Sequence, residues 1–395
     1  MSFGRHWRSA WLLDPAVTYL NHGTVGAVPR RVLAAQQAIR DAMERAPSRF
    51  MLRDLSGWVG GPRDRPTRMR EAAAAVARFV GAQAGDLVFV DNATAGVNAV
   101  LRSFRLGAGD EILITDHTYG AVANAARFVA RERGARVVRA TLPYPAFDAA
   151  RTAAAIDAAI TPATRIAIVD HITSESALVL PLAEIAARCR ARGVAVLADG
   201  AHAPGAIAVD VPAQGADWYI ANLHKWAHAP RSCGLLWARR ERQADLHPPV
   251  ISWGLDQGFT AEFDWVGTRD PSPWLAAPAG ISFLEELDFA AARTYMHDLA
   301  WRTARRLTDI WRTPLERPET SVGTMVTVPL PPEAGSTADD ALRLRNALLF
   351  EDHIEVQLHA GHGRLWVRIS AQIYNDDADV DRLVEAIGRR LKTQD

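Results

Sequence analysis

The chain has 395 residues, of which 49% are hydrophobic and 23% are charged, and this balance is typical of a globular protein rather than a membrane or disordered one. Basic and acidic residues number 45 each, so net charge gives no reason to expect a nucleic acid or a membrane surface as partner. The first ten residues lack the apolar stretch of a secretory signal, and Cys189 and Cys233 are expected to be buried free thiols. We therefore expect a cytoplasmic protein of two or three packed units.

Six short apolar runs, each ending in a polar residue, alternate with helical patterns such as residues 70–80 and 182–192. The runs span residues 87–91, 111–116, 136–141, 165–170, 194–199 and 217–222. This alternation predicts βα units that build a mostly parallel sheet, hence an α/β fold. Such sheets bind ligands outside the carboxyl ends of their strands, where Asn92, Asp170, Asp199 and Asn222 stand.

The last third of the chain changes character. Residues 247–278 are rich in Trp, Gly and Pro and predict a long functional loop. A helix is expected over residues 278–312, followed by strand 325–329, helix 337–350, strands 355–358 and 364–369, and helix 377–392. We therefore expect an N-terminal arm (1–20), a large domain (21–279) and a smaller α+β domain (280–395), against which the arm can pack.

Lysine is almost absent from the chain, since Lys225 and Lys392 are the only lysines. Lys225 stands in the apolar, His-rich stretch Asn222-Leu-His-Lys-Trp-Ala-His228. Only lysine forms an imine with an aldehyde, and burial lowers its pKa towards the nucleophilic range. The alternative is that Lys225 survives by chance in an Arg-rich chain.

Two other segments predict groups that suit an aldehyde cofactor with a phosphate. Asp199 ends a predicted strand, where its carboxylate can keep a pyridine nitrogen protonated, unless it only caps a helix. Asn92-Ala-Thr-Ala-Gly96 opens a helix after a strand, so its amides and the Thr94 hydroxyl suit a phosphate, or else simply cap that helix. The chain has neither G-x-G-x-x-G after its first predicted strand nor G-x-x-x-x-G-K-[ST], which disfavours a nucleotide.

Asp199-Gly-Ala-His202 together with Asn222-Leu-His-Lys225 resembles the class V aminotransferase superfamily. Tyr19-Leu-Asn-His-Gly-Thr-Val-Gly26 resembles its isopenicillin N epimerase-like branch, and the resemblance runs from Tyr19 to about residue 390. It implies an aminotransferase-like large domain and a pyridoxal 5'-phosphate (PLP) enzyme. Such an enzyme would bind an amino acid as an external aldimine and remove its Cα proton. The resemblance favours epimerisation as the reaction, with carbon–sulfur β-lyase and aminotransferase chemistry as the alternatives.

The resemblance also implies roles for single residues. Lys225 would hold PLP, Asp199 its pyridine nitrogen and His202 its phenolic oxygen. The phosphate would contact four residues: Ala93, Thr94, Asn222 and His224. Tyr119 of Asp116-His-Thr-Tyr-Gly120 would stack on the ring, with His117 as a rival that stays open.

Further residues would bind the substrate or a second subunit. Thr268 of Gly267-Thr-Arg-Asp270 resembles a residue that reaches the phosphate of the neighbouring subunit, which implies a homodimer with shared active sites. Arg368 of Val367-Arg-Ile-Ser370 matches an arginine that binds the substrate carboxylate with its fork of donors. The substrate side would further include Asn21, His22 and Ser174, and Arg53 would bind a distal acid.

Three competing hypotheses are weaker. His224 and His228 are spaced as zinc ligands on a helix, but Lys225 replaces the expected Glu, so we expect no catalytic metal. His359 and His362 are expected to be solvated in a Gly-rich turn. A regulator of this fold would usually carry a basic DNA-binding module, which is missing before Tyr19. Desulfuration through a persulfide is disfavoured because residues 358–364, the loop that carries a mobile Cys in cysteine desulfurases, lack cysteine.

Overall fold

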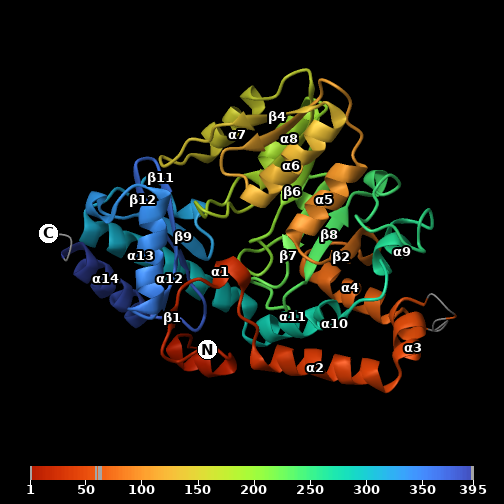
Figure 1. The fold of residues 1–395 in the computed structure, drawn as a ribbon, viewed down its shortest axis with the longest axis horizontal. Helices are drawn as coiled ribbons and strands as arrows, with labels where there is room; N and C mark the ends of the chain where they lie inside the picture. Colours follow the sequence, from red (N-terminus) through yellow and green to blue (C-terminus); the bar gives the residue numbers. More distant parts are fainter. Residues whose placement is uncertain (1, 58–59, 61–64, 393–395) are drawn as a thin grey trace.

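A seven-stranded sheet forms the centre of the computed structural model, which describes residues 2–57, 60 and 65–392 (Figure 1). Its order is β2 (Leu87–Val90), β8 (Gly234–Ala238), β7 (Trp218–Asn222), β6 (Ala195–Asp199), β5 (Thr164–Asp170), β3 (Glu111–Thr115) and β4 (Arg136–Ala140). Strands β3 to β7 pair in parallel, and β8 is antiparallel to both neighbours. The predicted α/β fold with a mostly parallel mixed sheet is confirmed.

Alternate side chains of the strands enter two separate cores. Leu87 and Phe89 join the cluster beneath α4 (Arg68–Phe79), α7 (Ala149–Ala158), α8 (Leu182–Ala191) and α11 (Ala277–Glu286). Val88 and Val90 join the cluster beneath α5 (Ala93–Ser103), α6 (Gly120–Arg133) and α9 (Phe259–Asp264). Successive strand residues point to opposite faces, and helices cover the sheet on both sides, so most of its strands are buried and largely apolar. The edge strand β4 is the exception, since it carries the exposed Arg136 and Arg139.

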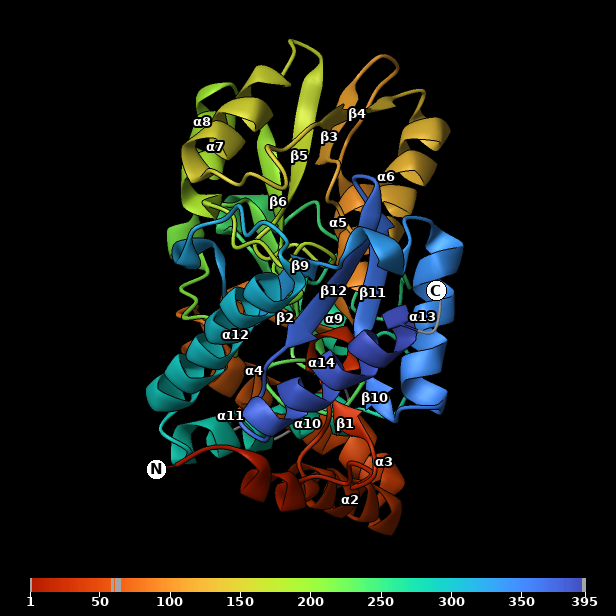
Figure 2. The same ribbon diagram turned by 90° about the vertical axis from the view of Figure 1, so that its left-hand side faces the viewer.

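The C-terminal part contains a second, antiparallel sheet of order β11 (Gln357–Gly361), β12 (Arg364–Ser370) and β9 (Met325–Pro329). Helices α12 (Phe289–Trp311), α13 (Ala338–Phe350) and α14 (Asp377–Lys392) surround it (Figure 2). The described residues contain no helix that is both long and apolar enough to cross a membrane.

Three local predictions were wrong. Residues 278–312 form two helices, because Asp288 adopts a left-handed conformation (φ 55°) and caps α12 through the Ala291 amide. The strand expected over residues 355–358 divides into β10 (Ile354–Glu355) and β11, which pair with different partners. The long loop over residues 247–278 contains α9 and the short helix α10 (Ser272–Leu275).

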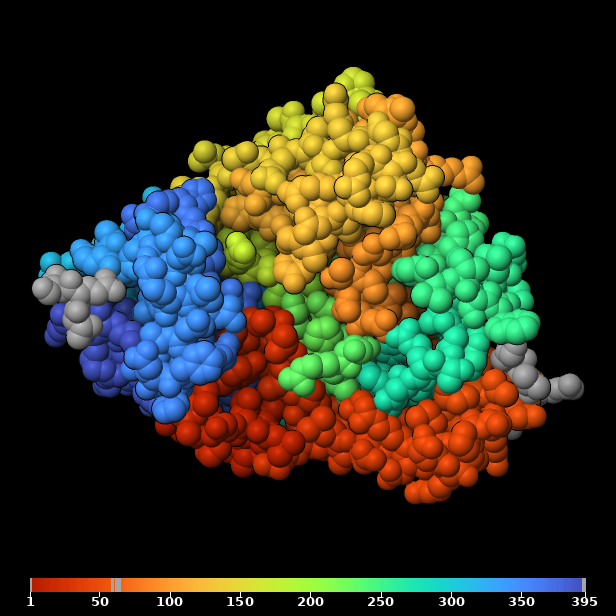
Figure 3. Space-filling view, in the orientation of Figure 1, coloured from red at the N-terminus to blue at the C-terminus, as the bar shows by residue number. Residues whose placement is uncertain are grey.

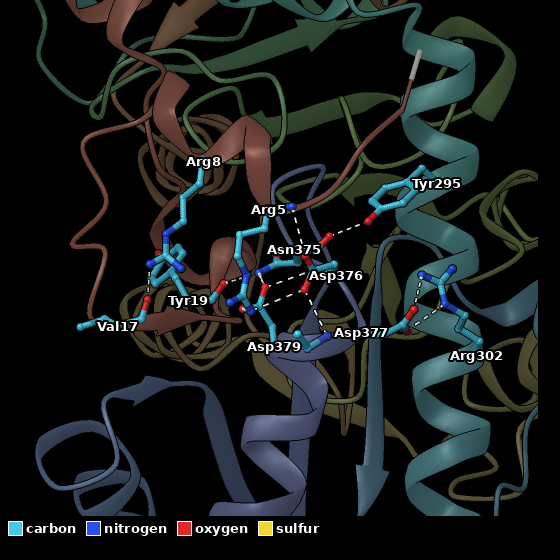
Figure 4. A network of polar contacts seen from close by, with 11 residues as sticks. Arg5, Arg8, Val17, Tyr19, Tyr295, Arg302, Asn375, Asp376, Asp377 and Asp379 are labelled. Atoms are coloured by element: carbon cyan, nitrogen blue, oxygen red, sulfur yellow. Dashed lines mark hydrogen bonds and ion pairs between the residues drawn. The ribbon is translucent and has the colours of Figure 1, made fainter.

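The N-terminal segment lies against the C-terminal part of the molecule (Figure 4). Strand β1 (Thr18–Tyr19) pairs in parallel with β10. Arg5 forms an ion pair with Asp379 at 2.9 Å, and the Asn375 side-chain amide donates to the Tyr19 carbonyl at 3.0 Å. Helix α1 (His22–Val25) then turns towards the central sheet. Helix α2 (Arg30–Arg45), followed by α3 (Pro47–Arg49), runs beneath α10 and α11 at the bottom of the molecule in Figure 1.

Candidate active site

A cavity of about 490 Å³ opens at the carboxyl ends of β5, β6 and β7, beside the start of α5. Figure 3 shows the surface hollowed near the centre of this face, where segments from both halves of the chain meet. The lining includes Thr24, Asn92, Ala93, Thr94, Tyr119, Asp170, Ser174, Asp199, His202, Asn222, His224, Lys225, Arg231 and Ser232. Most of the residues singled out from the sequence are thus brought together.

Lys225 follows β7 and reaches this cavity with only 8% of its surface exposed. Burial, reinforced by the positive charge of Arg368 and opposed by Asp199, lowers the pKa of Lys225 to about 7. Its Nζ lies 3.0 Å from Nε2 of His202, whose pKa burial and Lys225 hold well below the usual range. The amine is therefore available in its uncharged, nucleophilic form near neutral pH.

The loop that carries Lys225 is fixed from behind by α1. Nε2 of His22 contacts the Lys225 carbonyl oxygen at 3.0 Å, and its Nδ1 contacts the Tyr374 hydroxyl at 2.9 Å. Gly26, at φ 71°, approaches so closely that a Cβ there would stand 2.0 Å from the His224 carbonyl oxygen. His22 does not line the cavity, so it acts on the site through the backbone of Lys225.

Two buried carboxylates lie side by side at the ends of β5 and β6, where Asp170 and Asp199 are register partners. Burial raises the pKa of both, and the charge of Asp199 raises that of Asp170 further. Lys225 and the Ala201 amide favour the charged form of Asp199, whereas Oδ2 of Asp170 has no partner among the described residues. Asp199 is therefore the ionised member, and Asp170 holds the proton.

The opposite end of the cavity gathers groups that suit a phosphate. The Asn222 side-chain oxygen accepts from the Ala93 amide at 2.9 Å and fixes the start of α5, where Thr94 lines the cavity. His224 contacts the Cys233 carbonyl oxygen through Nδ1 at 3.0 Å. Arg231 also lines the cavity and was missed from the sequence, where only its position after the lysine turn could have revealed it.

Arg368 lies directly behind the cavity wall. Its guanidinium donates to the Ser174 carbonyl at 2.6 Å, to Thr24 Oγ1 at 2.7 Å and to Asn21 Oδ1 at 3.2 Å, while its Nε has no described partner. Burial lowers the pKa of Arg368 to about 10, so the group remains a cation at neutral pH. Thr24 and Ser174 line the cavity, whereas Asn21 lines a separate surface pocket.

The two candidates for ring stacking occupy different places. Tyr119 lines the cavity and is 49% exposed. His117 instead contacts Ser176 Oγ at 2.7 Å and faces a neighbouring cavity. The geometry favours Tyr119.

Other residues predicted from the sequence lie outside the cavity. Thr268 is exposed and Arg53 is exposed on another face, and neither is among the described lining residues. Arg269, next to Thr268, pairs with Asp91 at the cavity wall. The prediction that His359 is solvated was wrong, because it lies in β11 and burial lowers its pKa to about 4.

The described residues contain no group of three His, Cys, Asp or Glu side chains placed to hold a metal ion. His228, the second histidine of the zinc-like spacing, packs against Trp11, His22 and Phe283. It therefore belongs to an aromatic core rather than to the cavity.

The fold and the cavity together define an enzyme class in which a buried lysine, a carboxylate and a phosphate-binding helix start share one cleft. Residues 62–383 match the model of the aminotransferase class-V family, and the chain belongs to that family. It is 34% identical to an isopenicillin N epimerase of Streptomyces clavuligerus over 96% of both chains. It is 31% identical to a probable chloroplastic L-cysteine desulfhydrase of Arabidopsis thaliana over 95% of this chain and 83% of the relative.

A solved cystine C-S lyase, C-DES, in complex with its product cysteine persulfide, has the same fold. It superposes with a TM-score of 0.77 at 22% identity and covers 95% of this chain and 97% of its own. The chain is accordingly a PLP-dependent enzyme. The residues present fit this cofactor, because Nδ1 of His202 is a buried polar atom without a described partner and the cavity lining contains both the Asp199 carboxylate and the Arg231 guanidinium.

Proposed function

We propose that this enzyme removes the Cα proton of an amino acid and that Lys225 is the base. The observation that carries the proposal is the buried amine of Lys225, whose pKa is lowered to about 7 and whose Nζ lies 3.0 Å from His202. A base is most effective when its pKa lies near the working pH, since it is then largely unprotonated yet still basic.

Six residues and one aromatic ring would hold the cofactor. Bound PLP withdraws electrons from Cα and so makes its proton acidic. Asp199, the ionised carboxylate of its pair, would keep the pyridine nitrogen protonated, and His202 would donate to the phenolic oxygen. Ala93, Thr94, Asn222 and His224 would hold the phosphate, and Tyr119 would cover the ring.

The α-carboxylate of the substrate would be bound by Arg368. Its guanidinium is already oriented by Thr24 and Asn21, so little side-chain freedom is lost on binding. Ser174 lines the substrate side, and His22 supports the Lys225 loop. Arg53 would serve a distal acid only if the partner subunit brings it to the site, because it is exposed on its own subunit.

Two fates of the deprotonated substrate are supported by relatives. Return of the proton to the other face of Cα gives epimerisation, the activity named for the Streptomyces relative. Loss of a sulfur substituent from Cβ gives β-elimination, the activity named for the Arabidopsis relative. A persulfide on the protein is disfavoured, because Cys233 is buried and burial raises its pKa well above the usual range.

The proposed enzyme is a homodimer with shared active sites. Four large apolar side chains within six residues are exposed, namely Val250, Ile251, Trp253 and Leu255. Exposed apolar patches of this kind mark association surfaces. Thr268, in the same region of the chain, would then reach the phosphate in the partner's cavity.

Exchange of the Cα hydrogen in heavy water tests the proposal without assuming a product. The holoenzyme is incubated with a broad panel of L-amino acids, and deuterium at Cα is measured by mass spectrometry. We expect exchange with at least one amino acid and none with Lys225→Ala. Inverted configuration then identifies an epimerase, a keto acid with a released thiol identifies a lyase, and consumption of an added keto acid identifies an aminotransferase. Absence of exchange across the panel contradicts the proposal.

A further inference from the structure

A second cavity of about 330 Å³ adjoins the cofactor cavity. Tyr119 and Ser174 line both, so the two cavities lie side by side. The second cavity, here called the side chamber, is formed by the loops after β3, β4 and β5 and by the β11–β12 hairpin. The proposed proton transfer at Cα does not use the volume of the side chamber.

Aromatic rings form one wall of the side chamber. Tyr144 stands at the centre of this wall, with ring-centroid distances of 4.9 Å to His117 and 5.2 Å each to His362 and Trp366. Behind it the buried Arg317 donates to the Ser176 carbonyl at 2.8 Å and lies 5.6 Å from the Tyr144 ring centroid. The wall is therefore held in place from behind, and flat rings suit a planar guest.

The polar groups of the side chamber are mostly uncharged. Burial lowers the pKa of His117 and brings that of His359 to about 4, so both imidazoles are neutral at pH 7. Nδ1 of His359 is buried and has no hydrogen-bond partner among the described residues. A buried polar atom of this kind costs free energy until a guest satisfies it.

The charged groups around the side chamber disfavour an anionic guest. The carboxylates of Asp116 and Glu175 belong to its lining. Two buried cations lie close by, but neither is part of the lining. Arg317 donates to the Ser176 carbonyl and the Tyr144 hydroxyl, and Arg368 donates to the Ser174 carbonyl. A carboxylate guest would meet like charges without a free cation to offset them.

We propose that the side chamber binds the side chain of the amino-acid substrate and selects one that extends several atoms beyond Cβ and ends in a planar, polar, non-anionic group, such as an amide or a heteroaromatic ring. This inference rests on the proposed function, because it places the substrate backbone at Arg368. The Arg368 guanidinium donates to the carbonyl of Ser174, one of the two residues that line both cavities. A substrate whose backbone is bound at Arg368 has its side chain where the two cavities meet. The short side chain of cysteine would leave the side chamber empty.

Three cysteine derivatives test the inference on the holoenzyme: S-methyl-, S-carbamoylmethyl- and S-carboxymethyl-L-cysteine. The last two are nearly the same size and differ in an amide against a carboxylate. Binding is measured by titrating the change in visible absorption of the bound cofactor, and Cα exchange is measured separately. We expect the amide to bind at least about tenfold more tightly than either other compound, because only the amide can satisfy the buried polar atom of His359 without bringing a negative charge.

Variants locate the preference in the side chamber. His359→Phe keeps the ring and removes its polar atoms, and Tyr144→Leu removes the aromatic wall. Each should reduce the amide preference mainly through KM and binding, with little change in kcat for S-methyl-L-cysteine. His353→Asn, at an exposed turn residue with φ 57°, is the matched histidine control and should keep the preference.

The outcomes separate the two proposals. Equal or tighter binding of the carboxylate, or an amide preference that survives both chamber variants, overturns the inference about the side chamber. Preferential binding of the amide without Cα exchange for any compound or panel amino acid supports the chamber and overturns the proposed proton transfer.

Discussion

Lys225 and Lys392 occupy opposite environments, although they are the only lysines of the chain. Lys225 is buried beside His202, whereas Lys392 is exposed at the end of α14. Any amine-specific reagent therefore labels at most these two side chains, which makes the chemistry of Lys225 directly measurable.

The first prediction concerns the pH dependence of that chemistry. Because the pKa of Lys225 is lowered to about 7, its uncharged fraction grows as pH rises through that value. Reductive methylation of the apoenzyme with formaldehyde, mapped by mass spectrometry, should reach half its maximal rate at Lys225 near pH 7. Lys392 supplies the exposed comparison within the same sample. A rate at Lys225 that rises only near ~10.4, the ordinary lysine value, contradicts the prediction.

The second prediction separates the two buried carboxylates. Asp199→Asn removes a charge that faces Lys225 and should lower kcat by about 10²–10³-fold, the usual loss when one preorganised electrostatic group is removed. Asp170→Asn is the matched control, because an amide resembles the protonated carboxyl that we assign to Asp170, and its kcat should change far less. Thermal unfolding should show both variants folded. A loss of kcat in Asp170→Asn as large as or larger than that in Asp199→Asn would contradict the assignment of the proton to Asp170.

At the scale of elements, the six apolar runs of the sequence correspond to β2 to β7, because a strand covered on both faces has a largely continuous apolar run. Their polar ends at Asp199 and Asn222 therefore fell near Lys225 as expected. The break at Asp288 was not predictable from periodicity, since one left-handed residue causes it. The division of β10 from β11 depends on pairing with β1, from the opposite end of the chain.

The layout of the active site was likewise not predictable from local sequence patterns. Asp170 lies beside Asp199 only because β5 and β6 pair in one register, and that register is not visible in either segment. The side chamber combines loops after β3, β4 and β5 with a hairpin of the C-terminal part, so no local pattern marks it. His359 looked solvated because of its neighbouring glycines, yet it lies in a paired strand opposite Trp366.

The third prediction tests the close approach of α1 to the lysine loop. Gly26→Ala places a Cβ 2.0 Å from a backbone oxygen of His224 and also meets the penalty of a positive φ of 71°. Gly193→Ala has the same conformational penalty at φ 72° but no atom within 4 Å. Gly193→Ala should cost about 1–2 kcal/mol in the free energy of unfolding. Gly26→Ala should cost more and should also weaken PLP retention.

Urea unfolding of both proteins measures the difference, and the visible absorption of the bound cofactor reports the site. If Gly26→Ala is no less stable than Gly193→Ala and keeps its cofactor, the contact between α1 and the lysine loop does not constrain the site.

At the scale of the whole molecule, the cofactor cavity is built from both halves of the chain. Thr24 of α1 lines the cavity and accepts a hydrogen bond from Arg368 of β12 behind the wall. The N-terminal segment is fixed to the C-terminal part by β1 and Arg5. Movement of the C-terminal part relative to the central sheet would therefore change the substrate side of the cavity, while Lys225 and Asp199 stay on the sheet. The proposed association of two subunits would instead use the exposed apolar segment 250–255 and Thr268.

The last prediction concerns this association. Ile251→Asp introduces a charge into the exposed apolar segment 250–255 and should shift the protein from dimer to monomer at micromolar concentration, because a charge buried at an interface without a partner is costly. Leu342→Asp is the matched control, since Leu342 is 56% exposed against 54% for Ile251 and lies on α13, at the other end of the molecule from α9 (Figure 1). Sedimentation velocity measures the shift. If Thr268 reaches the partner's phosphate, the Ile251→Asp monomer should also lose PLP more readily than the control. A wild-type protein that stays monomeric with full cofactor content contradicts both the dimer and the shared site.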